Sequence, residues 1–226
     1  MVLIETSYQG VKVLIKFFGA SLLFLSVILG RAEAHPVAFA GSYSIMTWNS
    51  KDMSDWMLTH SFTSKYSLAA RYLRLQTEDG ERTFYVPQVN VLLKRWNELD
   101  SQANVYLSLG HGGEKVKSSF KNTSSVALET DWESRKYYVS ARGDALLSHK
   151  SSDQSIYQTK LRAGFAPYLA EFDEMNAWFI LEAFKSNKDE KEFKLTPFIR
   201  LFYHNVLTEF GVSSRGDAQF NFMVHF

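Results

Sequence analysis

From about residue 41 to the last residue, apolar and polar side chains alternate along most of the sequence. In the segment 157–165, for example, Tyr157, Leu161 and Phe165 alternate with residues that include Lys160 and Arg162. Successive side chains of a β-strand point to opposite faces, so a period of two predicts strands with one apolar and one polar face. A chain built this way is expected to be all-β and antiparallel.

Twelve such segments are predicted, although ten or fourteen strands are alternative counts. They cover residues 41–49, 54–62, 66–76, 83–96, 103–110, 123–132, 136–146, 155–168, 175–185, 192–204, 206–213 and 218–226. The faces of segment 54–62 are ambiguous. Strands of about 9–11 residues joined by alternating long and short connections are typical of bacterial membrane barrels. The odd-numbered connections are predicted to be external loops, and the longest of them is the Gly- and Lys-rich stretch 111–122.

The N-terminal segment has the pattern of an export signal. Lys12 and Lys16 precede the apolar run 17–30, which is followed by the small-residue pattern of Ala32, Glu33 and Ala34. A positive region, an apolar core and an A-x-A site predict a secretory signal peptide, whereas a membrane-spanning helix needs about 20 apolar residues. The predicted organisation is therefore a signal peptide at 1–34, cleaved after Ala34, and a barrel at 35–226; cleavage after Ala40 is the second choice.

Composition excludes several classes of function. The chain has 25 Lys and Arg against 24 Asp and Glu, so no strong basic field indicates a nucleic-acid partner. It has no cysteine, which excludes disulfides and thiolate metal sites. The mean hydropathy of −0.19 argues against a bundle of membrane helices. It does not argue against a membrane barrel, because only every second barrel residue faces lipid.

Alternation alone does not distinguish a membrane barrel from a soluble sandwich, because both have an apolar and a polar face. Two further patterns favour the membrane barrel. Aromatic residues such as Trp56, Tyr85, Trp132 and Tyr157 recur near the ends of predicted strands, as in interfacial girdles. The polar faces also contain aromatic residues and Met, as a crowded lumen would. A soluble exported sandwich or a lipocalin-like binding protein remains the alternative.

The last nine residues carry a more specific pattern. Phe220, Phe222, Val224 and Phe226 occupy alternate positions, and the chain ends on the last of them. This stretch resembles the C-terminal assembly signal of bacterial outer-membrane β-barrel proteins. The resemblance implies a single antiparallel, up-and-down transmembrane barrel in the outer membrane of a Gram-negative cell. It also implies outer-membrane lipid, lipopolysaccharide and the barrel-assembly machinery as partners; the oligomeric state is left open.

Charged residues on the predicted inner faces are the candidate functional residues. The cations are Arg71, Lys94, Arg142, Lys160, Arg162, Lys194 and Arg200, and the anions are Glu129, Asp131, Asp144, Glu182 and Glu209. Charges in a narrow lumen need partners or water, because an unpaired buried charge is costly. Two interpretations follow: a narrow small-solute channel with a slight preference for anions, or a structural barrel whose lumen is filled by salt bridges.

An enzyme is the rival class, because a Ser/His pair on the outer wall could hydrolyse lipids. The nearest candidates are His60 and Ser61, with His204 and His225 elsewhere. Adjacent strand residues point to opposite faces, so His60 cannot act as the base for Ser61. The chain is therefore predicted to be non-enzymatic, without cofactor or metal. His35 is expected to start the mature chain as an unstructured terminus, and His111 is expected to be a loop residue.

Overall fold

The computed structural model describes residues 35–77, 80–149, 154–171, 173–189 and 193–226. Within these ranges the chain folds into twelve antiparallel β-strands. They are β1 (Tyr43–Ser50), β2 (Met53–Ser61), β3 (Tyr66–Thr77), β4 (Gly80–Asn97), β5 (Ser101–Val116), β6 (Ser119–Ser134), β7 (Tyr137–Ser148), β8 (Ile156–Phe165), β9 (Asn176–Ser186), β10 (Lys194–Tyr203), β11 (Val206–Val212) and β12 (Ala218–His225). The predicted count of twelve strands is confirmed. Among the described residues, no helix is long and apolar enough to cross a membrane.

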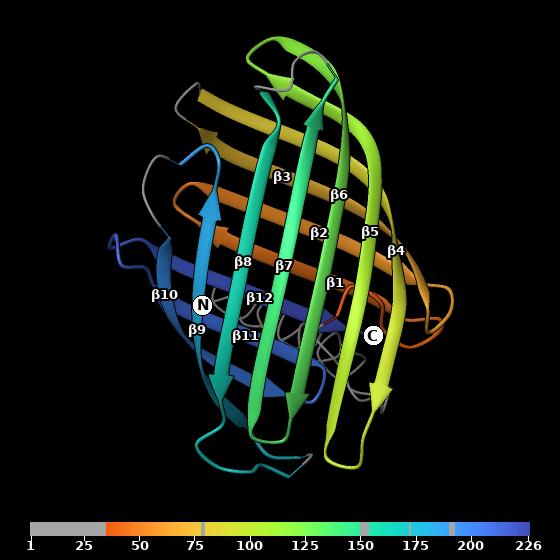
Figure 1. Cartoon of the computed structure of the whole chain (residues 1–226), viewed down its shortest axis with the longest axis vertical. Coiled ribbons are helices and arrows are strands. Elements are labelled where there is room, and N and C mark those ends of the chain that lie inside the picture. The colour runs from red at the N-terminus through yellow and green to blue at the C-terminus, as the bar shows by residue number, and fades with distance from the viewer. Residues whose placement is uncertain (1–34, 78–79, 150–153, 172, 190–192) are drawn as a thin grey trace, which may run out of the picture.

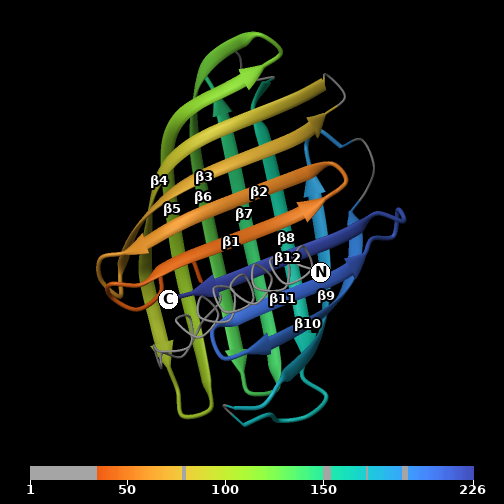
Figure 2. The ribbon, with the colours of Figure 1, turned by 180° about the vertical axis from the view of Figure 1, so that it is seen from behind.

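The first and last strands pair with each other and close the sheet into a barrel (Figure 1, Figure 2). Their register runs from Ser44 opposite His225 to Ser50 opposite Gln219. Beyond it, the Tyr43 amide donates to the Phe226 carbonyl at 2.7 Å, and the Phe226 amide donates back to the Tyr43 carbonyl at 2.9 Å. Every strand therefore has two neighbours, which satisfies the backbone groups that an open sheet edge would leave unpaired.

The two faces of the wall are arranged as in a membrane barrel. On β3, Tyr66, Leu68 and Tyr72 point outward and are exposed, whereas Ser67 and Arg71 point inward and are buried. The same alternation runs along the other strands, so the outer wall is apolar and the lumen is polar. A soluble barrel has the reverse arrangement. The apolar outer face therefore fits a lipid surrounding and not water.

The strands differ in length, and the long ones form an extension at one end. We call the end that holds Tyr43 and Phe226 the terminus end, and the opposite end the loop end. β4, β5 and β6 contain 18, 16 and 16 residues, whereas β1, β11 and β12 contain 8, 7 and 8. Figure 1 shows β5 and β6 rising beyond the other strands at the loop end and curving over.

The predicted external loop at 111–122 is wrong, because most of these residues form the arms of the β5–β6 hairpin. The pairing runs from His111 opposite Ser124 to Val116 opposite Ser119, and the turn comprises only Lys117 and Ser118. The glycines that suggested a loop serve close packing instead. A Cβ on Gly112 would lie 2.1 Å from the Tyr85 carbonyl oxygen of β4, so only glycine fits there.

Apolar contacts across the lumen narrow the barrel at the loop end. Leu73 and Phe84 of β3 and β4 form a buried cluster with Leu146 and Ile156 of β7 and β8. These strand pairs are separated by β5 and β6 in the sheet order, so the contact joins opposite walls. The larger space left at this end is lined by residues of β1, β2, β3, β8, β9, β10 and β12.

Candidate functional site

Arg71 of β3 is the centre of a group of buried ion pairs in the middle of the lumen. Its Nη2 lies 2.8 Å from Asp55 Oδ2 and its Nη1 lies 2.9 Å from Asp144 Oδ2. Arg142 contacts the same Asp144 oxygen at 2.9 Å and Glu129 at 2.7 Å. We call these five side chains the Arg71 cluster. It contains two cations and three carboxylates.

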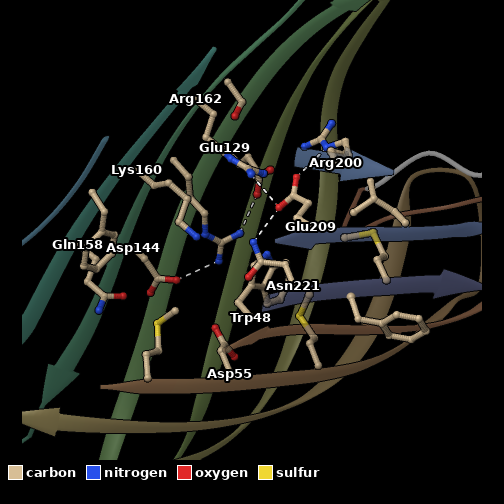
Figure 3. Close-up of a pocket in the computed structure, with 18 of the residues that line it drawn as sticks. Trp48, Asp55, Glu129, Asp144, Gln158, Lys160, Arg162, Arg200, Glu209 and Asn221 are labelled. Carbon is tan, nitrogen blue, oxygen red and sulfur yellow. Dashed lines mark hydrogen bonds and ion pairs between the residues drawn. The ribbon is translucent and has the colours of Figure 1, made fainter. Parts of the chain in front are cut away.

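A second group surrounds Glu209 of β11. Its two carboxylate oxygens accept hydrogen bonds from Arg200 Nε at 2.7 Å and from Arg162 Nη2 at 2.8 Å. Arg162 Nε also lies 3.3 Å from Glu182, and Lys160 Nζ lies 3.8 Å from the same carboxylate. We call these five side chains the Glu209 cluster. It contains three cations and two carboxylates, and Figure 3 shows members of both clusters around one cavity.

Other lumen side chains hold these charges in place. Asn221 Nδ2 donates to Glu209 at 2.7 Å. The Arg200 guanidinium lies 4.7 Å from the centre of the Tyr138 ring, and that of Arg162 lies 5.4 Å from the Phe198 ring. A buried charge is tolerated only when partners replace its lost hydration. Each arginine here has both a carboxylate and an aromatic or second acidic partner.

Two of the ion pairs cross the lumen, and the others join neighbours along the wall. Arg71 and Asp144 lie on β3 and β7, and Arg162 and Glu209 lie on β8 and β11; neither pair of strands is adjacent in the sheet. The cavity among these side chains has a volume of about 100 Å³. That is small beside the roughly 300–1,000 Å³ of an ordinary small-molecule pocket. The two clusters therefore leave only a small space in the middle of the barrel.

A larger cavity opens toward the loop end, and we call it the vestibule. Its volume is about 350 Å³, within the usual range of small-molecule pockets of roughly 300–1,000 Å³. Lys194 lies over the Phe184 ring at 5.3 Å, and Arg215 is paired with Asp189 at the rim. The vestibule and the central cavity share lining residues that include Trp48 and Lys160. The two spaces are therefore neighbours along one route.

The segment before β1 enters the terminus end of the barrel. We call residues 35–42 the N-terminal strap. Val37 is buried against Leu92 and Tyr106. The Pro36 carbonyl accepts a hydrogen bond from Ser67 Oγ at 2.7 Å. The Ala38 amide also donates to a serine hydroxyl of β2 at 3.1 Å. The strap therefore fills space that would otherwise lead out of the lumen at this end.

His35 is part of this packing and is not an unstructured terminus. Its ring stacks on Tyr106 at a centroid distance of 5.3 Å, and its Nδ1 lies 3.4 Å from Asp131. Burial, with Arg95 as the next contributor, lowers the pKa of His35 to about 3. The imidazole is therefore neutral at ordinary pH. The expectation that this residue is disordered is wrong, because Leu92 and Tyr106 give the strap an apolar surface to cover.

Most of the predicted lumen residues converge. Nine of the twelve belong to the two clusters: Arg71, Glu129, Arg142, Asp144, Lys160, Arg162, Glu182, Arg200 and Glu209. Asp131 lies apart from them, below the strap, where it accepts a hydrogen bond from Asn104 at 2.7 Å. Lys194 lines the vestibule. These eleven side chains are therefore distributed over three levels of the lumen.

Lys94 is the exception, and its placement corrects the prediction. A β-bulge between Leu92 and Lys94 shifts the register against β5 by one residue. The shift turns Lys94 outward, where it is exposed beside Trp96, and turns Arg95 inward. Arg95 then donates to Asn104 Oδ1 at 2.7 Å and to the Tyr106 hydroxyl at 3.1 Å.

Sequence reasoning missed two sets of inward charges. Asp55 lies on β2, whose faces are ambiguous in sequence, and its partner Arg71 becomes evident only once the register is known. Arg82 and Glu114 form a buried ion pair at 2.6 Å near the loop end. Both residues fall in segments that were expected to be external loops. The alternation of Arg82, Phe84 and Val86 in the sequence is the pattern that would extend the predicted strand 83–96 toward Arg82.

Charge is balanced within the two clusters. Together they contain five cations and five carboxylates, because the additional Asp55 offsets the predicted cationic excess. The Arg71 cluster has one carboxylate too many and the Glu209 cluster has one cation too many. The two groups are therefore complementary, and together the two clusters carry no net formal charge.

His60 and Ser61, the pair considered for an enzyme, face opposite sides of the wall. His60 points outward between Tyr43 and Phe62, whereas Ser61 is buried and accepts the hydrogen bond from Ala38. His225 Nδ1 lies 2.6 Å from Ser44 Oγ, but both residues are buried and neither lines the central cavity or the vestibule. This serine–histidine contact therefore packs the terminus end. Among the described residues, no group of three or more His, Asp and Glu is placed to hold a metal ion.

The sequence and the structure were compared with known proteins. No family model and no curated protein matches the sequence. Among solved structures, the KdgM porin aligns with 82% of this chain and 98% of its own, at 14% identity and a TM-score of 0.48. The same porin in complex with disordered oligogalacturonate gives the same values. A loop-deletion mutant of OmpT, an outer membrane protein of Vibrio cholerae, aligns at 7% identity and a TM-score of 0.30, with 82% and 97% coverage.

Proposed function

We propose that this chain is an outer-membrane barrel that passes small solutes through a narrow lumen, which its cross-lumen ion pairs close at rest. The single observation that carries the proposal is the order of spaces along the axis. A vestibule of about 350 Å³ leads to a cavity of about 100 Å³ that is lined by the charged side chains of both clusters together with Met57, Leu207 and Met223. Charged side chains can exchange partners with water or with a polar solute that enters the cavity.

We propose that the resting lumen has no net preference for cations or anions, because the two clusters are balanced in charge. A solute that enters has to replace ion pairs with contacts of its own, so small polar solutes are favoured over large or apolar ones. The strap narrows the opposite end and makes the route asymmetric. We place the loop end at the cell exterior, because both chain ends of the barrel meet at the other end, toward the periplasm.

The balance of charges also supports a second candidate, a structural barrel without conduction. Small barrels with complete internal salt bridges need no solute to satisfy their lumen. Both candidate functions need the same closed barrel with the same paired charges in its lumen. They differ only in whether the ion pairs open.

Conductance across a planar bilayer separates the two candidates. For the wild-type chain we expect small, brief openings. Glu209→Gln removes the shared partner of Arg162 and Arg200, so we expect larger and longer openings with a preference for anions. Glu81→Gln on the exposed face of β4 is the matched control, and it should behave like the wild type. If the Glu209 variant stays silent at all voltages, the chain is a structural barrel and the channel proposal fails.

A further inference from the structure

Two histidines on the outer wall at the loop end are directed at one oxygen atom. His111 Nδ1 and His149 Nε2 each lie 3.0 Å from Ser124 Oγ. The serine is on β6, His111 is opposite it on β5, and His149 directly follows β7. The two imidazole rings are 5.5 Å apart at 83°, and both are exposed. Three consecutive strands thus bring two ring nitrogens to the same point outside the lumen.

The hydrogen bonds at this point depend on the tautomers of both rings. A hydroxyl has one proton, so Ser124 can donate to one imidazole and has to accept from the other. A divalent cation in place of this shared proton does not require one ring to donate and the other to accept, because it binds the lone pair of each neutral imidazole. Imidazole is a preferred ligand of Zn²⁺, Cu²⁺ and Ni²⁺, with nitrogen–zinc distances of about 2.0–2.1 Å. Nitrogens that already share one partner atom need only small side-chain rotations to share a cation.

We propose that His111 and His149 form a surface site for one late first-row divalent cation, with Zn²⁺ as the reference ion. Ser124 and water complete the coordination. The site faces the medium at the loop end, so the ion does not need to enter the lumen. A bound ion joins β5 to the end of β7 and stiffens the hairpin extension. The site is independent of conduction, because none of its three residues lines the central cavity or the vestibule.

The test is a Zn²⁺ titration of the mature barrel, refolded in detergent without an affinity tag and followed by calorimetry. We expect one ion per chain with a dissociation constant in the micromolar range. His111→Asn and His149→Asn should each weaken binding by about tenfold or more, and the double variant should abolish it. Electron paramagnetic resonance with Cu²⁺ should show coupling to two nitrogens in the wild type and to fewer in each single variant.

Two controls keep the result specific to these histidines. Ser124→Ala should retain most of the affinity, because water can replace the hydroxyl. His60→Asn removes an outward histidine on β2, on another part of the wall, and should leave binding unchanged. A heat-dependent shift in gel mobility shows that each variant is folded. The proposal fails if the wild type takes up no Zn²⁺ at millimolar concentration, or if the double variant binds as tightly as the wild type.

Discussion

At the scale of single residues, the position of an arginine relative to the wall decides its contribution to stability. Arg71 and Arg74 lie three residues apart on β3 and face opposite sides. Arg71 is buried between Asp55 and Asp144, whereas Arg74 is half exposed and lies 4.0 Å from Glu81. Removal of one partner from a buried ion pair leaves the other charge without compensation, whereas an exposed pair is screened by water. The same chemical change should therefore have very different effects at the two positions.

We expect Arg71→Met to lower the free energy of unfolding by about 3–5 kcal/mol, because it leaves the buried Asp55 without its cation and Asp144 with Arg142 alone. Arg74→Met should change it by less than about 1 kcal/mol. Urea titration of the barrel in lipid vesicles, monitored by tryptophan fluorescence, measures both. Equal effects of the two substitutions would show that Arg71 does not have the buried partners assigned to it.

The sequence predicts these inward charges well wherever alternation is regular. All nine predicted members of the clusters lie on strands whose faces are clear, for example Arg142 and Asp144 on β7. Asp55 could not be assigned, because β2 mixes polar and apolar residues on both faces. Pairing between distant strands, such as Arg71 with Asp144, depends on barrel closure, which no local pattern contains.

At the scale of elements, one bulge changes the face on which every later residue of its strand lies. Before the bulge of β4, Gln88 and Asn90 point into the lumen; after it, Arg95 does. A strict period of two continues the first pattern and places Lys94 inside. Bulges are set by packing and pairing with the neighbouring strand, so a single sequence does not reveal them. The pairing of β5 with β6 at residues 111–122 likewise depends on the neighbouring strand, so the sequence pattern there predicts a loop.

Cysteine labelling tests the bulge directly, because the chain contains no cysteine of its own. A fluorophore on Lys94→Cys should be quenched by brominated lipid, because this side chain points outward. The same fluorophore on Arg95→Cys should be protected, because this side chain points into the lumen. The reverse order of quenching would mean that β4 has no bulge and that Lys94 lines the lumen.

The N-terminal strap is the second element with an effect on the lumen. It is held by the apolar contacts of Val37 and by hydrogen bonds to its backbone, as at the Pro36 carbonyl. No strand pairing of the barrel wall depends on residues 35–38, since β1 begins at Tyr43. The strap can therefore be removed without opening the sheet.

Deletion of residues 35–38 should increase conductance and leave the heat-dependent gel shift intact, because the terminus end loses its filling and the wall does not change. The matched variant is Val37→Ala, which keeps the backbone contacts and should give a smaller increase. Planar-bilayer recordings of both variants beside the wild type provide the measurement. Unchanged conductance after the deletion would show that the strap does not restrict the route.

At the scale of the whole molecule, the barrel depends on a seam between the two ends of the chain. β1 and β12 are far apart in sequence and pair over seven positions, and the amides of Tyr43 and Phe226 extend this pairing. Such long-range pairing is slow to form, and until it forms the sheet has two open edges. The alternating Phe220, Phe222, Val224 and Phe226 lie on or directly after the strand that completes the seam, and of these Phe220 is exposed whereas Val224 is buried.

Phe226→Ala separates assembly in the cell from the stability of the closed barrel. The hydrogen bonds between residues 43 and 226 use backbone atoms, so the substitution keeps them. We therefore expect a nearly unchanged urea midpoint after refolding in vitro. In cells, we expect a several-fold smaller folded fraction in the outer membrane, because we propose that the assembly machinery recognises this side chain. Heat-dependent gel mobility of membrane fractions measures that fraction.

Phe210→Ala, an outward aromatic on neighbouring β11, is the control. Equal yields from both variants would mean that the terminal side chain carries no assembly signal.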